Sequence, residues 1–257
     1  MAKVIAIINQ KGGVGKTTTA VNLSALLGAM GQRVLMIDLD PQGNTTSGLG
    51  MEVDDKSIYE VIMGRMKLTD VMEETEFKNL SIAGSDVRLA NAELELVEVE
   101  KREYRLKTAV QSVQQDFDFI FIDCPPSLGL LTINALGAAD SVLIPIQCEY
   151  YALEGVASLM NTISRVKKTI NPHLEIEGVL LTMLDGRTNL GLQVVDEVKK
   201  HFKKQVYATV IPQRPPRRSA LPRRTHPRLR QAERGMRRLR QSGEGSSQAQ
   251  QHQGERI

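Results

Sequence analysis

The sequence has no tryptophan, only two cysteines and few other aromatic residues, and these shortages exclude several classes of protein. Cys124 and Cys148 are too few for a disulfide scaffold or a self-contained zinc site. No apolar run approaches the ~20 residues needed to cross a bilayer. The apolar start of the chain soon meets Asn9 and Lys11, so it lacks the length of a signal peptide. We therefore expect a cytoplasmic protein.

Lysine is also missing, but only from one end of the chain. Residues 1–212 carry 21 basic and 27 acidic side chains, whereas residues 213–257 carry 12 arginines, three acidic residues and no lysine. The net charge of +3 therefore averages an acidic body and a strongly basic tail. The tail is rich in arginine, proline and glutamine and has too little apolar surface to offset the entropy of ordering it, so we expect it to be disordered.

The apolar pattern of the 257-residue chain favours the α/β class. Short runs that are apolar throughout, as expected of strands covered on both faces, alternate with longer helical patterns. This alternation predicts a doubly wound, mostly parallel sheet with helices on both faces, in one domain over residues 1–212. The predicted strands cover residues 3–8, 33–38, 80–83, 118–123, 141–146, 177–184 and 205–211. The predicted helices lie near residues 16–30, 57–63, 88–99, 102–115, 128–138, 152–170 and 190–203.

A glycine-rich loop follows the first predicted strand and opens the first predicted helix. Residues 9–19 read Asn-Gln-Lys-Gly-Gly-Val-Gly-Lys-Thr-Thr-Thr, with Gln10 where the general phosphate-loop pattern has its first glycine. Glycines let backbone N–H groups curl around phosphate oxygens, and the helix adds its positive dipole end. A turn without a ligand is disfavoured because strand, loop and helix are in register. The predicted nucleotide-binding residues are Lys11, Gly12, Gly13, Val14, Gly15, Lys16, Thr17 and Thr18.

Three aspartates at predicted strand ends suit the same chemistry. We expect Lys16 to reach the β- and γ-phosphates and Thr17 to ligate Mg²⁺. Asp123 ends a buried strand, where a magnesium–water shell needs an anchor. Asp38 and Asp40 end the second strand, so that one would lie near the metal and the other could orient the attacking water. The predicted metal site is therefore Thr17, Asp38 and Asp123.

Five segments carry recognisable motifs in order along the chain: Lys-Gly-Gly-Val-Gly-Lys-Thr-Thr at residues 11–18, Asp-Leu-Asp-Pro-Gln-Gly-Asn at 38–44, Phe-Ile-Asp-Cys-Pro-Pro-Ser-Leu-Gly at 121–129, and the segments at 147–155 and 185–191. Together they resemble the deviant Walker A ATPases, and within them the ParA/Soj partitioning branch, and the resemblance runs from residue 2 to about Pro212. It implies a P-loop fold, ATP and Mg²⁺ as cofactors, and weak, partner-stimulated ATP hydrolysis. It also implies an ATP-bound homodimer, non-specific binding to nucleoid DNA and a ParB-like partner, which together segregate chromosome or plasmid DNA.

The resemblance also gives roles to single residues. It makes Lys11 the lysine that crosses the dimer interface to the partner's nucleotide, and Lys16 the lysine that binds phosphate. Gly12 would lie where two subunits approach closely. Asp40 would orient the water, with Asp38 as a secondary candidate.

DNA contacts within the body are expected from basic side chains near the second half of the resemblance. Four lysines over two turns of a predicted helix suit contact with phosphates, although a solvated helix face explains them equally well. The candidate DNA-binding residues are Arg187, Lys199, Lys200, Lys203 and Lys204.

The resemblance stops after Pro212. The family pattern continues with an Arg-Asn-led loop, a Ser-Glu-Ala-Pro-type segment and a closing amphipathic helix, none of which follows here. We hypothesise a shifted reading frame over residues 213–257. The rival is a genuine basic arm that binds nucleic acid or, through a stripe of Leu229, Ala232, Met236 and Leu239, a membrane surface.

The sequence is also compatible with two other functions. One is a membrane-cycling positioning ATPase similar to MinD, although segments 147–151 and 187–190 argue against it and we expect no stable membrane association. The other is a nucleotide-gated regulator of replication or sporulation genes.

Overall fold

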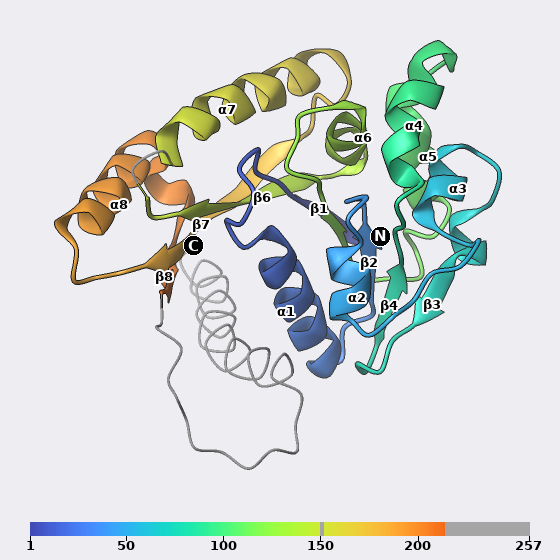
Figure 1. The fold of residues 1–257 in the computed structure, drawn as a ribbon, viewed down its shortest axis with the longest axis horizontal. Helices are drawn as coiled ribbons and strands as arrows, with labels where there is room; N and C mark the ends of the chain where they lie inside the picture. Colours follow the sequence, from blue (N-terminus) through green and yellow to red (C-terminus); the bar gives the residue numbers. More distant parts are fainter. Residues whose placement is uncertain (150–151, 214–257) are drawn as a thin grey trace, which may run out of the picture.

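The computed structural model describes residues 1–149 and 152–213 of the chain, and Figure 1 shows a single sheet with helices on both sides. Eight strands follow the order β3-β4-β2-β5-β1-β6-β7-β8. They are β1 Lys3–Ile7, β2 Val34–Asp38, β3 Met72–Glu74, β4 Leu80–Ala83, β5 Phe119–Asp123, β6 Ser141–Gln147, β7 Glu175–Leu184 and β8 Val206–Pro212. All neighbours pair in parallel except β3, which runs antiparallel to β4. The predicted doubly wound, mostly parallel sheet is confirmed.

Eight α-helices and four short 3-10 helices connect the strands of the described residues. The α-helices are α1 Lys16–Ala29, α2 Asn44–Gly48, α3 Ile58–Ile62, α4 Leu89–Glu95, α5 Arg105–Gln111, α6 Leu130–Ala138, α7 Ala152–Thr169 and α8 Asn189–Phe202. The 3-10 helices are η1 Leu68–Asp70, η2 Leu96–Glu98, η3 Arg102–Tyr104 and η4 Lys203–Gln205. Every predicted element is present, but β3 and α2 were not predicted. Both are too short and too polar to produce an apolar period.

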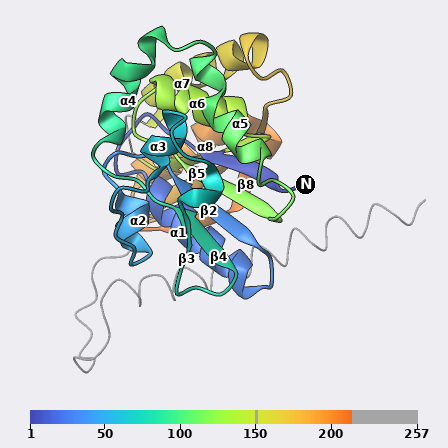
Figure 2. The ribbon, with the colours of Figure 1, turned by 90° about the vertical axis from the view of Figure 1, so that its right-hand side faces the viewer.

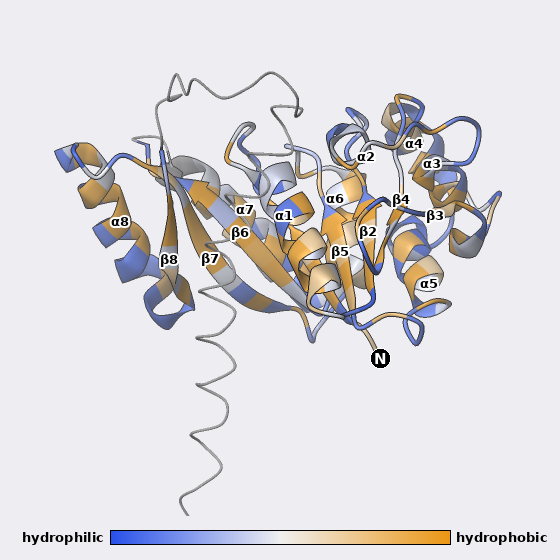
Figure 3. Cartoon of the chain, turned by 90° about the horizontal axis from the view of Figure 1, so that it is seen from below, coloured by the Kyte–Doolittle hydropathy of each residue, from blue (hydrophilic) through white to orange (hydrophobic). Residues whose placement is uncertain are grey.

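The two faces of the sheet are covered unequally. One buried cluster joins the sheet to α3, α4, α5, α6, α7 and α8, and a smaller one joins it to α1. Figure 2, turned by a quarter from Figure 1, shows α3–α7 on one side of the strands and α1 with α2 on the other. The central strands β1, β2 and β5 are buried almost throughout, and β2 and β5 are mostly hydrophobic in Figure 3. These buried strands fix the position of the loops that follow them.

The two edges of the sheet differ. Strand β3 has three residues, of which Glu73 and Glu74 are exposed. Strand β8 has seven residues, none of them fully buried, and within the described ranges no strand pairs with its outer side. No helix in the described part of the chain is long and apolar enough to cross a membrane. The expectations for residues 214–257 fall outside the described residues.

Candidate functional site

The carboxyl ends of β2, β5 and β1 meet at one edge of the sheet. These strands are neighbours, and their register places Asp123 of β5 beside both Asp38 of β2 and Ile7 of β1. The glycine-rich loop therefore leaves β1 next to the two buried aspartates. Residues far apart in the sequence converge here because parallel strands end together.

The loop between β1 and α1 has the form of an anion site. Gly13 and Gly15 have φ angles of +75° and +94°, in the left-handed region that glycine adopts without strain. A Cβ atom placed on Gly12 or Gly13 would meet no atom of the described structure within 4 Å. Gly15 is the N-cap of α1, and no side-chain hydrogen bond or acidic residue occupies the first turn of this helix. The first N–H groups of α1 are thus free for an anionic ligand.

Two buried polar side chains hold the loop in shape. Asn9 Nδ2 donates to the carbonyl of Pro145 at 2.7 Å, and Asn9 Oδ1 accepts from the N–H of Lys11 at 2.9 Å. On the other side, Thr182 Oγ1 of β7 donates to the carbonyl of Val14 at 2.8 Å. Thr182 was not predicted from the sequence. Its sequence signal is a polar residue near the carboxyl end of an otherwise apolar strand.

Lys16 lies in the first turn of α1 with its side chain turned into the site. Its Nζ donates to the carbonyl of Lys11 at 3.2 Å, and the residue is buried. Burial lowers the pKa of Lys16, and the nearby carboxylate of Asp123 opposes that change. Within the described residues Lys16 makes no ion pair. A bound phosphate would supply the negative charge that this ammonium group lacks.

Asp123 is the centre of the site. Its Oδ2 accepts hydrogen bonds from Thr17 Oγ1 at 2.7 Å and from Thr45 Oγ1 at 2.6 Å. Its Oδ1 is buried and has no hydrogen-bond partner among the described residues. Burial raises the pKa of Asp123 to about 6, although the two threonine hydrogen bonds oppose the rise. An unpartnered, buried carboxylate oxygen beside a threonine hydroxyl fits a magnesium ion or a water molecule of its shell.

Asp38 is engaged by the chain itself. Its Oδ2 accepts from the N–H of Thr46 at 2.8 Å and from Thr46 Oγ1 at 2.7 Å, and its Oδ1 accepts from the N–H of Asp40 at 3.2 Å. Burial, helped by repulsion from Asp123, raises the pKa of Asp38 to about 7. Asp38 therefore fastens α2 to the end of β2. Thr45 and Thr46 were not predicted, because α2 itself was not.

Asp40 and Lys11 lie beyond the carboxyl ends of β2 and β1, respectively. Asp40 is buried beyond the end of β2, and its Oδ1 accepts from the N–H of Gln42 at 3.0 Å. Lys11 Nζ forms an ion pair with Glu149 at 3.3 Å, and both side chains are partly exposed. Cys124 and Cys148 are buried free thiols.

The proposed DNA-contact residues lie at the two ends of α8. Arg187, just before the helix, forms an ion pair with Asp185 at 2.7 Å, and its hydrogen bonds lower the pKa of Asp185 to about 2. Helix α8 has 14 residues, so it is about 20 Å long. The exposed lysines follow at its far end and in η4; they are Lys199, Lys200, Lys203 and Lys204. The structure does not join Arg187 and the lysines into one cluster.

Comparison with known proteins agrees with this geometry. The family model described as an AAA domain matches residues 2–176. The sporulation initiation inhibitor protein Soj of Bacillus subtilis is 58% identical over 214 residues, which cover 82% of this chain and 85% of Soj. This chain belongs to the ParA/Soj family. Another relative, the chromosome partitioning protein ParA of Myxococcus xanthus, is 51% identical over 82% of this chain and 76% of its own length.

Some of the solved structures similar to this ParA/Soj-family chain contain bound nucleotides. A Mycobacterium smegmatis protein named cobyrinic acid a,c-diamide synthase, with bound ADP and magnesium, is 41% identical with a TM-score of 0.79. The match covers 83% of this chain and 88% of that chain. A putative plasmid partition protein from Borrelia burgdorferi bound to AMPPNP is 28% identical with a TM-score of 0.72, over 83% and 86% of the two chains.

Proposed function

We propose that this chain is an ATP-driven switch that segregates DNA. In this proposal it binds ATP and Mg²⁺, hydrolyses ATP weakly, dimerises when ATP is bound and holds DNA without sequence preference. A ParB-like partner stimulates hydrolysis and so resets it. The arrangement at Asp123 carries the proposal: Thr17 and Thr45 share one of its oxygens, and the other is buried without a partner among the described residues. The relatives named ParA and Soj support the partitioning role.

The residues of the loop would hold the nucleotide phosphates. The first N–H groups of α1 have no side-chain cap, and the ammonium group of Lys16 lies beside the carbonyl of Lys11 in the same loop, so the loop offers donors and positive charge to a phosphate. Thr17 and Asp123 would hold Mg²⁺, with Asp38 behind them as the anchor of α2. When bound, Mg²⁺ neutralises charge on the phosphates.

Asp40 would orient the attacking water. It follows Asp38 by two residues, is buried at the same edge of the sheet, and uses only one oxygen in a described hydrogen bond. The second oxygen can accept a hydrogen bond from a water molecule. Positioning of this kind is the main contribution that a protein makes to phosphoryl transfer.

Lys11 and Gly12 would act in the dimer. Lys11 is partly exposed, and its ion pair with Glu149 is of the surface type, worth at most about 1 kcal/mol. Lys11 can therefore leave Glu149 and contact the nucleotide of a partner subunit at a small cost in free energy. Since a Cβ on Gly12 meets nothing within the described part of its own chain, an obstruction there would come from a molecule outside the chain, and we propose that this is the second subunit.

Gly12→Val tests the switch directly. We expect the variant to fold and to bind ATP with an affinity within about threefold of the parent, because a Cβ atom at this position meets no atom of its own chain within 4 Å. Dimer formation with ATP should fall at least tenfold, about 1.4 kcal/mol. Light scattering coupled to gel filtration measures the dimer, and a labelled ATP analogue measures binding. A Gly12→Val protein that still dimerises with ATP would contradict the proposed interface.

Non-specific DNA binding is proposed for the two ends of α8. The ion pair of Arg187 with Asp185 presents the arginine at the surface, and the lysines at the other end are exposed. Contacts at two points about 20 Å apart suit a duplex, whose phosphates repeat along its whole length. The lysines also stabilise α8 through the helix dipole, so their loss would affect both properties.

We also propose that the ATPase domain ends at Pro212 and that a frame shift produced residues 213–257. The alignments with the Soj and ParA relatives cover 82% of this chain, which agrees with an ending unlike that of the family. Reading the gene in its other two frames beyond codon 212 should restore an Arg-Asn-led loop and a closing amphipathic helix. If neither frame restores them, the basic ending is genuine and the frame-shift proposal is wrong.

A further inference from the structure

Helix α2 connects the two buried aspartates of the candidate site. Thr45 Oγ1 donates to Asp123 Oδ2 at 2.6 Å. The next residue, Thr46, donates to Asp38 Oδ2 through both its N–H and its hydroxyl. All four side chains are buried, and the two aspartates end the adjacent strands β5 and β2. Thr46 therefore fastens α2 to β2, whereas Thr45 acts on the carboxylate of the neighbouring strand.

The hydroxyl of Thr45 makes no described hydrogen bond to its own helix. Threonine hydroxyls in helices commonly bond to a nearby backbone group, as Thr108 in α5 does to the carbonyl of Tyr104 at 3.1 Å. Thr45 instead bonds to a residue 78 positions away in the sequence. A valine would occupy the same buried space without a polar atom that needs a partner. The hydroxyl of Thr45 is therefore explained by the carboxylate that it contacts.

Two hydroxyls from different elements share one oxygen of Asp123. Thr17 of α1 donates to Oδ2 at 2.7 Å, beside the bond from Thr45, while Oδ1 is buried and has no partner among the described residues. Two donors on one oxygen restrict the rotation of the carboxylate and leave Oδ1 to accept a hydrogen bond from a metal-bound water. Thr17 is also an expected ligand of Mg²⁺, so Thr45 is the donor that has Asp123 as its one described partner.

The loop between β4 and α4 packs closely against α2. Its Ser85 donates its N–H to Thr46 Oγ1 at 2.9 Å. A Cβ atom on Gly84 would lie 3.0 Å from Thr46 Cγ2. A Cβ atom on Gly43, the N-cap of α2, would lie 3.2 Å from the carbonyl oxygen of Ser85. Because the loop and α2 approach so closely, α2 and its Thr45 have little room to shift.

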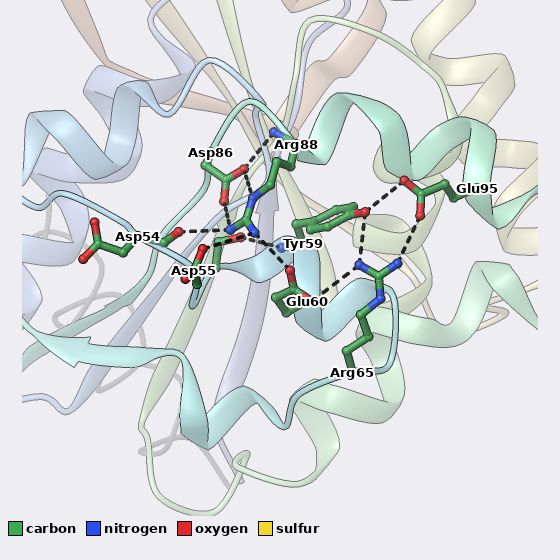
Figure 4. Close-up of polar contacts among 9 residues, drawn as sticks. Asp54, Asp55, Tyr59, Glu60, Arg65, Asp86, Arg88 and Glu95 are labelled. Carbon is green, nitrogen blue, oxygen red and sulfur yellow. Dashed lines mark hydrogen bonds and ion pairs between the residues drawn. The ribbon is translucent and has the colours of Figure 1, made fainter.

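A polar cluster fastens the same loop to α3 (Figure 4). Arg88 pairs with Asp86 of the loop at 2.8 Å and with Glu60 of α3 at 3.2 Å. The guanidinium carbons of Arg88 and Arg65 lie 5.6 Å and 5.2 Å from the centre of the Tyr59 ring. Cation–π contacts and carboxylate partners thus hold the loop against α3. The support of α2 therefore does not depend on a bound ligand.

We propose that Thr45 is a positioning residue for the magnesium–nucleotide complex. Its hydroxyl holds the carboxylate of Asp123 so that Oδ1 is left for the water shell of Mg²⁺. This role rests on the proposed function, in which Thr17 and Asp123 hold the metal. Thr45 itself contacts neither the metal nor the phosphates. Loss of a hydrogen-bond partner of a metal ligand typically lowers metal affinity or activity by about 10- to 100-fold.

The test measures how nucleotide binding by the full chain depends on Mg²⁺. ADP labelled with a fluorescent methylanthraniloyl group is titrated into each protein in EDTA and over a range of Mg²⁺ concentrations. The Mg²⁺ concentration that gives half of the gain in affinity is called the Mg²⁺ midpoint. Thr45→Val keeps the branched shape but removes the hydroxyl, so its Mg²⁺ midpoint should rise about tenfold or more. Its affinity in EDTA should stay within about twofold of the parent, because the role of Thr45 is exerted through the metal ligand.

Two further variants separate the hydroxyl from the rest of the side chain. Thr45→Ser keeps the hydroxyl and loses the methyl group, so its Mg²⁺ midpoint should lie within about threefold of the parent. Thr108→Val is the matched control, since it removes a threonine hydroxyl whose described bond is to the Tyr104 carbonyl, and it should behave as the parent does. An unchanged Mg²⁺ midpoint in Thr45→Val would overturn the proposal. A Thr45→Ser protein as defective as Thr45→Val would also overturn it, because packing would then account for the effect.

Folding and the proposed function are checked on the same proteins. Circular dichroism establishes that each variant is folded, and Thr45→Ala, which also lacks the hydroxyl, carries the same expectation if valine is not tolerated. A parent that binds the labelled ADP no better with Mg²⁺ than in EDTA would refute the proposed function. A parent with a clear Mg²⁺ dependence that Thr45→Val leaves unchanged would refute the role of Thr45 alone.

Discussion

Replacement of Lys16 by alanine is expected to weaken ATP binding at least 100-fold, about 2.7 kcal/mol, without unfolding the protein. The ammonium group is buried at the opening of the loop, and its only described hydrogen bond is to a backbone carbonyl. Loss of its charge-assisted hydrogen bonds to phosphate accounts for an effect of this size. Isothermal calorimetry with ATP and Mg²⁺ measures the affinity.

The stability of the same variant should not fall, in contrast to its ATP affinity. Because burial lowers the pKa of Lys16, the folded state disfavours its charge, and removal of the side chain should leave the melting temperature unchanged or raise it. Lys56→Ala, at an exposed lysine, is the matched control and should bind ATP normally. Unchanged ATP affinity in Lys16→Ala would contradict the phosphate-loop assignment.

Asp40→Ala is expected to slow ATP hydrolysis at least 100-fold while ATP affinity stays within about threefold. Loss of a group that positions the reacting water costs 10² to 10⁴ in rate, a range of about 3–5 kcal/mol. Because reset requires hydrolysis, the ATP-bound dimer should accumulate. Single-turnover phosphate release measures the chemical step, and gel filtration in ATP measures the dimer.

A conservative variant distinguishes the proposed role of Asp40 in orienting water from its hydrogen bond to the N–H of Gln42. Asp40 also accepts the N–H of Gln42, and the asparagine of Asp40→Asn keeps an acceptor for that bond. If the carboxylate orients water, Asp40→Asn should be as slow as Asp40→Ala. Turnover in Asp40→Asn close to that of the parent would show that Asp40 acts only by shaping the turn.

Most of the sheet and the phosphate loop could be predicted from the sequence because both produce strong local patterns. Strands buried on both faces are apolar throughout, and a strand–glycine loop–Lys-Thr–helix order leaves few alternatives. The small elements were missed for the opposite reason. Helix α2 is five residues of Asn, Thr, Ser and Gly, and it forms because Asp38 holds Thr46, a contact that no local pattern reveals.

Contacts between distant segments account for the rest of what was missed. Thr182 reaches the carbonyl of Val14 across 168 residues, and Lys11 meets Glu149 across 138. Position along the sequence also does not show that Arg187 and the lysines that follow it are separated by the length of α8; their role in DNA binding stays a prediction. Such distances depend on the tertiary fold, and the periodicity of apolar residues along the sequence does not reveal them.

The unequal edges of the sheet bear on how shortened versions of the protein would behave. The β3 edge is short and carries Glu73 and Glu74, which discourage pairing with another molecule. The β8 edge is longer and contains Tyr207, Val210 and Ile211. A chain cut after Pro212 would leave that strand edge open as a template for aggregation, so we expect such a shortened protein to lose solubility before its phosphate site is disturbed.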